Sequence, residues 1–462
     1  MSLLITILQW LVGAFLVLVA VVLVSLYIRG AFRWRPLFHI NRAIPPEDPR
    51  FLTALKSLTH SLETTGQVIK FWNTADDIQQ ARLAAIARAQ QRIQFETFMM
   101  TPGRRASDFA EAIIRKAEEG VSVQLLVDSY GARKLEDSYW QRLRSAGVQV
   151  VFFNPFDWRA PANYAGRTHR KLLIIDGDRV LIGGAGISDL WDGVEEDVTE
   201  PWLDIEVALT GEVVNLLSAT FQFHWQGHRL KRSGVSAVDM EAIYPDLERV
   251  QTKHANRLGW QRLVQSEDPE VEASEQAASP ILVTPGTRPT YRHSPIEMLK
   301  QTLVACARER IWLSSPYFLP NESTRAMLIA AQQSGVDVRI LTTSIRTDKK
   351  PVYYASYEVY GSLLKAGIKI FEYQPSMIHA KMLIIDSKWV NMGSANIDYR
   401  SYLHNDELDI ITDSTELFNR VEETFEQGFA RCDQITLRQW KRRSWLKHRL
   451  LGNGVRLVQW QL

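Results

Sequence analysis

Hydrophobic residues follow two different patterns along the chain. An apolar run from Ser2 to Ile28 contains no charged side chain. At 1.5 Å per residue, a helix of this length is about 40 Å long, enough to cross a hydrocarbon core of roughly 30 Å. After Gly66, apolar positions at helical spacing alternate with short apolar runs typical of strands. The pattern predicts an α/β fold with buried strands, preceded by a transmembrane helix.

The order of these elements occurs twice. The strand-like segments that begin at Ile93 and Val121 have counterparts that begin at Ile311 and Val336, 218 and 215 residues later. A repeat on this scale indicates an internal duplication of two large lobes, each with a mixed sheet flanked by helices, rather than an array of small repeats.

Composition divides the chain further, because an acidic stretch before residue 280 and prolines near residue 45 both indicate exposed connections. We expect an anchor at 1–29, a linker and lead-in at 30–65, a first lobe at 66–230, an inter-lobe linker at 231–280, a second lobe at 281–434, and a basic, Trp-rich interfacial tail at 435–462.

Charges near the two ends of the chain bear on its relation to a membrane. Arg29, Arg33 and Arg35 follow the apolar run, so the positive-inside rule predicts a single-pass protein of the cytoplasmic (inner) membrane with a cytoplasmic body. A cleaved signal peptide is the alternative, although it would normally have a basic leader and a small-x-small cleavage site. The segment 438–449 has six Lys or Arg and no acid, which suits an anionic bilayer surface or, alternatively, a solvated basic helix.

Overall composition excludes several classes of protein. The net charge of +2 gives no basic field of the kind that nucleic-acid-binding proteins usually have, so no nucleic-acid partner is expected. Cys306 and Cys432 are the two cysteines of the sequence. Their separation suggests neither a disulfide framework nor a thiolate zinc site.

A short motif occurs once in each predicted lobe. The phrases "THRKLLIID" (168–176) and "IHAKMLIID" (378–386) share the pattern His-x-Lys-x-x-x-x-Asp. Because side chains alternate faces along a strand, each histidine and its lysine point the same way. The aspartates have the opposite parity and are predicted to brace the turn after the strand. We take all six motif residues as candidate catalytic residues: His169, Lys171, Asp176, His379, Lys381 and Asp386.

Two such motifs in duplicated lobes predict a single pseudo-twofold active site. It would contain two imidazoles and two ammonium groups, which suit reaction at a phosphodiester. Lysines neutralise the nonbridging oxygens, one imidazole attacks phosphorus, and the other protonates the leaving oxygen.

The motifs and their surroundings resemble the phospholipase D superfamily and, within it, the bacterial cardiolipin synthases. The resemblance covers nearly everything after Gly66 and is carried by "RTHRKLLIIDGDRVLIGG", "SSPYFLPNE" and "HAKMLIIDSKWVNMGSANIDYRSYLHNDE". Ser394 and Asn396 match the family phrase in the second half, whereas Gly186 stands where the first half usually has asparagine. This departure removes one side-chain donor to a phosphate and puts equal roles for the two lobes in doubt.

The resemblance also implies roles for particular residues. His169 would be the nucleophile that forms a phosphatidyl-histidine, and His379 the general acid and then the general base, with no metal or other cofactor. Asp204 and Glu407 would be supporting carboxylates that hold the far imidazole nitrogens. Their neighbours Glu206 and Asp406 are the alternatives for these two positions.

One histidine pair invites a different interpretation. His224 and His228 have the i,i+4 spacing of a helical metal site, but a zincin motif would need glutamate at Trp225, so helix packing is favoured.

The implied activity is transfer of a phosphatidyl group from phosphatidylglycerol to a second phospholipid, with release of glycerol. The partners would then be phospholipids and the bilayer. The alternatives are a hydrolytic phospholipase D, which passes the same intermediate to water, a nuclease of this fold, and a membrane scaffold whose site has decayed.

Overall fold

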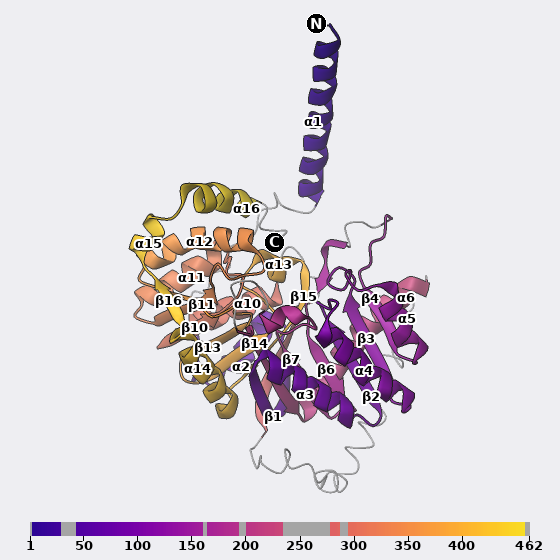
Figure 1. Cartoon of the computed structure of the whole chain (residues 1–462). Coiled ribbons are helices and arrows are strands. Elements are labelled where there is room, and N and C mark those ends of the chain that lie inside the picture. The colour runs from indigo at the N-terminus through magenta and orange to yellow at the C-terminus, as the bar shows by residue number, and fades with distance from the viewer. Residues whose placement is uncertain are drawn as a thin grey trace.

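The computed structural model describes residues 2–28, 43–159, 164–193, 200–233, 278–286 and 294–457. Helix α1 (Ser2–Ile28) stands apart from the body of the protein (Figure 1). Its segment Leu3–Ser25 is long and apolar enough to cross a membrane. Arg29, Arg33 and Arg35, on which the predicted orientation depends, lie outside the described residues.

The body repeats one order of elements in two lobes. The first lobe contains β1 (Leu62–Thr74), α3 (Ala75–Arg88), β2 (Arg92–Thr97), α4 (Arg104–Glu118), β3 (Ser122–Asp128), α5 (Asp137–Ser145), β4 (Gln149–Phe153), β5 (Arg167–Thr168), β6 (Leu172–Ile175), β7 (Arg179–Gly183), β8 (Leu203–Thr210) and α6 (Glu212–Ser233). The second contains β9 (Ser279–Gly286), α10 (Pro295–Cys306), β10 (Arg310–Ser314), α11 (Glu322–Gln333), β11 (Asp337–Thr343), α12 (Lys350–Lys365), β12 (Lys369–Tyr373), β13 (Met382–Ile385), β14 (Trp389–Gly393), α13 (Tyr399–Leu403), β15 (Asn405–Thr412), α14 (Thr415–Phe429) and β16 (Cys432–Ile435).

The described strands form a 16-stranded sheet that is continuous from one lobe to the other. Three strands pair in parallel in each lobe: β2, β3 and β4 in the first, and β10, β11 and β12 in the second. The first strand of each set also pairs antiparallel with a neighbour, β2 with β6 and β10 with β13. Antiparallel pairing then continues through β7 and β8 in the first lobe and through β14 and β15 in the second. Strands β1 and β9 join the lobes, because β1 pairs with β8 and β9, and β9 pairs with β15. The predicted fold class, two lobes with mixed sheets and flanking helices, is confirmed.

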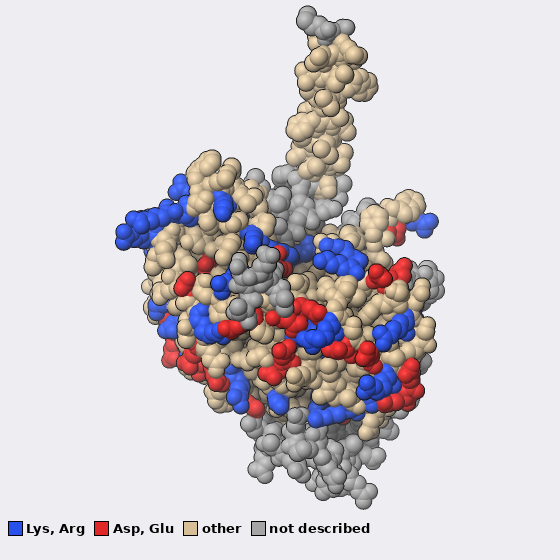
Figure 2. Space-filling model, viewed as in Figure 1, with Lys and Arg blue, Asp and Glu red and all other residues tan. Residues whose placement is uncertain are grey.

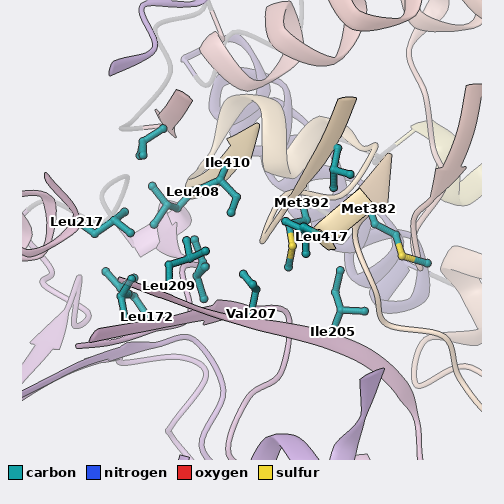
Figure 3. Packing of buried hydrophobic residues seen from close by; sticks show 14 of the residues in the cluster. Leu172, Ile205, Val207, Leu209, Leu217, Met382, Met392, Leu408, Ile410 and Leu417 are labelled. Atoms are coloured by element: carbon teal, nitrogen blue, oxygen red, sulfur yellow. The ribbon is translucent and has the colours of Figure 1, made fainter. Parts of the chain in front are cut away.

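A single apolar core connects the two lobes. Side chains from β8 of the first lobe and from β14 and β15 of the second face one another in it (Figure 3). Helices α6 and α14 contribute Leu217 and Leu417 to the same cluster. Interiors of this kind are close-packed and resist displacement, so the shared core fixes the position of one lobe's strands relative to the other's.

The segment before β1 departs from the predicted linker. Residues 51–59 form helix α2 (Phe51–Thr59), and the buried Phe51 and Leu55 belong to the core of the second lobe. Trp389 of β14 donates a hydrogen bond from Nε1 to the carbonyl oxygen of Pro46 at 2.9 Å. The prolines near residue 45 predict a linker, but a short helix follows them. The second lobe, which is distant in sequence, buries the apolar face of this helix.

Candidate active site

Each motif histidine is held against the opposite lobe by backbone pairing. The short strand β5 runs parallel to β15, and the His169 amide donates to the carbonyl oxygen of Asp406 at 2.8 Å. In the same way, Leu203 forms a parallel bridge with Ile378, and the His379 amide donates to the carbonyl oxygen of Leu203 at 2.7 Å. The residue after each of these acceptors is a carboxylate, which the pairing therefore brings beside the imidazole.

The two carboxylates are exchanged between the lobes. Nδ1 of His169 lies 3.0 Å from Oε2 of Glu407, and Nδ1 of His379 lies 2.7 Å from Oδ2 of Asp204. Nδ1 of His169 also lies 3.0 Å from the carbonyl oxygen of Ser394, so this nitrogen has two acceptors and must carry the proton. In each ring the nitrogen left for chemistry is Nε2. The family resemblance implies these two carboxylates but not their exchange between the lobes, which depends on contacts between segments distant in sequence.

A different donor orients each carboxylate. Ser394 Oγ donates to Oε2 of Glu407 at 2.5 Å, whereas Trp191 Nε1 donates to Oδ2 of Asp204 at 2.9 Å. Gly184 is the first-half counterpart of Ser394 in the motif, and a Cβ added there would clash with Oδ1 of Asp204. The first half therefore replaces a serine donor by a tryptophan.

Trp191 also lies close to Gly186. A Cβ at this position would lie 2.9 Å from the carbonyl oxygen of Met99 and 3.2 Å from the Trp191 ring. Trp191 thus occupies space near the place where the family usually has an asparagine. In the second half Asn396 is buried, and its Oδ1 accepts no hydrogen bond from the protein. The two lobes are therefore similar in backbone but differ in side chains close to the site.

The motif lysines lie beside the histidines, as alternation along the chain predicts. Lys381 Nζ is 2.9 Å from Nε2 of His379, and Lys171 Nζ donates to the carbonyl oxygen of His169 at 2.6 Å. All four side chains are buried, with His169 and His379 only 8% and 6% exposed. Two buried ammonium groups next to two imidazoles form a site with high affinity for an anion.

Burial governs ionisation in this site. Desolvation lowers the pKa of His169 to about 4, although the charge of Glu407 opposes it. Desolvation and then the charge of Lys381 lower the pKa of His379 to about 3. Burial alone would raise the pKa of Glu407, but His169 and Lys171 more than offset it and lower this pKa to about 2. At neutral pH, neutral imidazoles therefore lie beside ionised carboxylates.

The lysines are affected in the same way. Desolvation lowers the pKa of Lys381 to about 8, with partial compensation by the charges of Asp204 and Glu407. Desolvation, followed by the charge of Lys381, lowers the pKa of Lys171 well below its ordinary value. An incoming phosphodiester would supply the negative charge that favours both ammonium groups.

The motif aspartates lie at the far end of their strands. Asp176 and Asp386 are seven residues after their histidines, a separation of about 20 Å along an extended chain. Asp176 accepts hydrogen bonds from the backbone amides of residues 90–92 at 2.7–2.8 Å, and Asp386 accepts from those of residues 308–310 at 2.7–3.1 Å. Both have φ of +53°, an uncommon left-handed conformation. The motif groups them with the candidate catalytic residues, but these hydrogen bonds correspond to the bracing role that their parity predicts.

Beneath the site, each lobe has a buried ion pair that sequence reasoning missed. Arg82 of α3 donates from Nε to Oε1 of Glu206 at 2.8 Å and from Nη2 to the carbonyl oxygen of Ala185 at 2.9 Å. In the second lobe, Lys300 of α10 lies 2.8 Å from Oδ2 of Asp409. A basic residue in an amphipathic helix normally faces solvent, so neither Arg82 nor Lys300 stands out in the sequence. The signal that could have indicated buried ion pairs here is the 218-residue offset between the two, which places them at corresponding positions of the two lobes.

The remaining histidine pair packs within the first lobe, and His224 also contacts the second lobe. His224 Nδ1 lies 2.9 Å from Oε1 of Glu96, and Nε2 lies 3.4 Å from Oδ2 of Asp406. His228 stacks on Phe153 with a ring-centroid distance of 4.1 Å. The side chains of Asp406 and Glu206, the alternatives to the two supporting carboxylates, contact His224 and Arg82 respectively.

Comparisons with known proteins agree with this geometry. The family described as "Cardiolipin synthase, PLD-like domain" matches residues 83–190 and 300–428. The chain is 29% identical over 412 residues to "Cardiolipin synthase 2" of Bacillus anthracis, covering 88% of this chain and 73% of that protein. It is 30% identical over 364 residues to "Cardiolipin synthase" of Oceanobacillus iheyensis, covering 79% and 69%.

A solved structure shares the architecture. The phosphatidylserine synthase of Haemophilus influenzae Rd KW20 aligns with a TM-score of 0.63 at 14% identity, covering 89% of this chain and 99% of that one. At this identity the likeness concerns the fold alone. The resemblance inferred from the two motifs is confirmed, and the chain belongs to the phospholipase D-like family of cardiolipin synthases.

Proposed function

We propose that the protein is a cardiolipin synthase, a phosphatidyltransferase that joins two phospholipids. One observation carries the proposal: two buried histidines, each with an adjacent ammonium and a carboxylate from the opposite lobe, converge on one site. This site provides a nucleophile, a proton donor and two cations for a phosphate, as displacement at a phosphodiester requires.

In the first step, Nε2 of His169 attacks the phosphorus of phosphatidylglycerol. The nitrogen has a free electron pair because Nδ1 holds the proton toward Glu407 and Ser394. A P–N bond forms, the P–O bond to glycerol breaks, and the glycerol oxygen takes a proton from Nε2 of His379, which must enter this step as the imidazolium paired with Asp204. The negative charge of the bound phosphodiester favours this protonated form. Lys171 and Lys381 stabilise the charge on the nonbridging oxygens. Glu407 stabilises the positive charge that develops on the attacked imidazole.

In the second step, a hydroxyl of the acceptor lipid displaces His169 from phosphorus. His379 now removes the proton from that hydroxyl, so each turnover leaves both imidazoles as they began. A site that admits water at this stage would release phosphatidic acid instead. The difference between synthase and hydrolase therefore depends on which hydroxyl reaches the intermediate.

The proposal is tested with full-length protein in vesicles that contain isotope-labelled phosphatidylglycerol. Mass spectrometry should detect cardiolipin and released glycerol with the parent protein, and neither product with His169→Ala or His379→Ala. Phosphatidic acid without cardiolipin would identify a hydrolase. Cardiolipin formation that survives both substitutions would contradict the site. Adding phosphatidylethanolamine in a parallel reaction identifies the acceptor.

We also propose that α1 anchors the protein in the inner membrane with the body on the cytoplasmic side. The uncharged helix supports the anchor, and the three arginines that follow it support the orientation. A protease added to inside-out membrane vesicles should digest the body, whereas the same protease outside spheroplasts should not. The reverse pattern would contradict the orientation.

A further inference from the structure

The C-terminal segment folds onto the second lobe and is fixed there by its inner face. It contains α15 (Leu437–Lys441), a π-helix at Trp445–Gly452 and α16 (Asn453–Leu457), and it lies over α12 (Figure 1). Trp440 Nε1 donates to the carbonyl oxygen of Tyr357 at 2.8 Å, and Arg443 forms a buried ion pair with Glu358. The His448 ring packs on Tyr357 with a centroid distance of 4.7 Å. We call residues 437–457 the tail module.

The outer face of the tail module is both apolar and basic. Four large apolar side chains are 44–64% exposed: Trp445, Leu446, Leu450 and Leu451. Lys441, Arg442, Lys447 and Arg449 are exposed among them, and residues 437–457 contain no acid. Figure 2 shows Lys and Arg at the edge of the tan surface that the C-terminal helices form. Tryptophan, leucine and lysine together suit the headgroup region of an anionic bilayer.

A second exposed apolar site lies on the first lobe, in the loop after β4. Phe156 and Trp158 are 67% and 75% exposed, and they are the most exposed aromatic side chains in the described part of this lobe. Arg159 lies over the Trp158 ring at 5.3 Å. We call residues 156–159 the β4 loop.

The β4 loop is connected to the active site by stacked side chains. Phe156 contacts Tyr164 edge to face at 5.7 Å, and the Arg167 guanidinium lies 4.4 Å from the centre of the Tyr164 ring. Arg167 and Thr168 form the short strand β5, and His169, the proposed nucleophile, follows it directly. A contact made by Phe156 is therefore only two side chains away from the strand that places His169.

Both surfaces lie on the side of the body from which α1 extends, one on each lobe (Figure 1). We propose that the tail module and the β4 loop dock the body on an anionic lipid surface, with the interface between the lobes, and hence the active site, held between the two contacts. An anchor at a single point does not by itself set the orientation of the body on the bilayer. Two further contacts, one on either side of the lobe interface, would orient it.

The depth of single nitroxide labels tests this docking without any catalysis. Trp445→Cys and Trp158→Cys are labelled in full-length protein with Cys432→Ser, because Cys306 is buried. The matched control is Asn419→Cys, an exposed position of α14 on the opposite side of the body (Figure 1). The protein is reconstituted into vesicles of phosphatidylcholine with phosphatidylglycerol, and collisions with oxygen and with a water-soluble nickel chelate are measured.

The expected result is high oxygen access and low nickel access at 445 and 158, with the opposite ratio at 419. Immersion at 445 should decrease in pure phosphatidylcholine, because the exposed lysines and arginines lose their anionic partners. Equal nickel access at all three positions would overturn the proposal. Protection from both reagents at 445 or 158 would indicate a protein contact, such as a second copy of the chain, and would also overturn it.

A kinetic test rests on the proposed function. In Phe156→Ser/Trp158→Ser, the ratio of turnover on vesicle phosphatidylglycerol to turnover on dispersed short-chain phosphatidylglycerol should decrease at least about fivefold relative to the parent. An unchanged ratio would contradict a docking role for the β4 loop. Loss of both activities, when the labels at 445 and 158 are immersed as expected, would leave the docking proposal intact and count against the proposed function instead.

Discussion

At the scale of single residues, the site depends on exchange between lobes, since each imidazole is oriented by a carboxylate from the other half. The exchange makes the supporting carboxylates unequal. Glu407→Gln should remove the negative charge that stabilises the attacked imidazole of His169 and slow the first chemical step by about 10²–10⁴-fold. Asp204→Asn should act on His379 instead and impair proton transfer.

A phosphatidyl ester with a p-nitrophenol leaving group, which departs without a proton, separates the two effects. After acid quench and mass spectrometry, Asp204→Asn should accumulate phosphatidyl-His169, and Glu407→Gln should not. Accumulation in Glu407→Gln, with the lipid on His379, would reverse the roles proposed for the two histidines.

The pH dependence of kcat/KM follows from two of these residues. Below pH about 4 His169 becomes protonated, and as the proposed nucleophile it would then have no electron pair for phosphorus, so activity should decrease on the acid side. Above pH about 8 Lys381 loses its proton and the charge that binds phosphate, so activity should decrease on the alkaline side as well. Lys381→Arg retains its charge at high pH and should move the alkaline limb upward. An alkaline limb that is unchanged in this variant would assign it to another group.

At the scale of elements, each motif aspartate connects the end of its strand to the start of the neighbouring strand. Asp176 connects β6 to β2, and Asp386 connects β13 to β10. Asp386→Asn removes the charge of the side chain, and asparagine adopts the left-handed backbone conformation found at this position. The variant therefore measures the contribution of the carboxylate's hydrogen bonds with the amides of residues 308–310. We expect a loss of about 1–3 kcal/mol in the free energy of unfolding. Activity per folded molecule should change little. Asp176→Asn is the matched variant, and denaturant unfolding measures both. A large loss of activity without a loss of stability would return Asp386 to the catalytic residues.

The sequence predicts these elements where the signal is local. Alternation along "THRKLLIID" and "IHAKMLIID" is sufficient to place each lysine beside its histidine, and the repeated order of strands and helices predicts two lobes. The sequence predicts a linker where helix α2 forms, because residues of the second lobe, distant in sequence, bury the apolar face of this helix. Similarly, the pairing of Arg82 with Glu206 requires contacts across 124 residues. Such features are set by packing between distant segments, which no local pattern records.

At the scale of the whole molecule, the two lobes share a continuous sheet and one apolar core. We therefore expect them to unfold together. Leu209 of β8 is fully buried in the shared core, next to residues of β15 (Figure 3). Leu209→Ala should therefore lower the free energy of unfolding by about 2–5 kcal/mol. Leu143→Ala in α5, which belongs to a core of the first lobe alone, is the control.

Hydrogen exchange read by mass spectrometry distinguishes the two variants. Leu209→Ala should accelerate exchange of β2 in the first lobe and of β10 in the second to a similar extent, because the shared core opens as a unit. Leu143→Ala should act mainly on the first lobe. Unchanged exchange in β10 of Leu209→Ala would mean that the lobes open independently. Because each histidine relies on a carboxylate from the other lobe, independent opening would also disrupt both imidazole–carboxylate pairs, whereas cooperative opening keeps the site intact until the whole body unfolds.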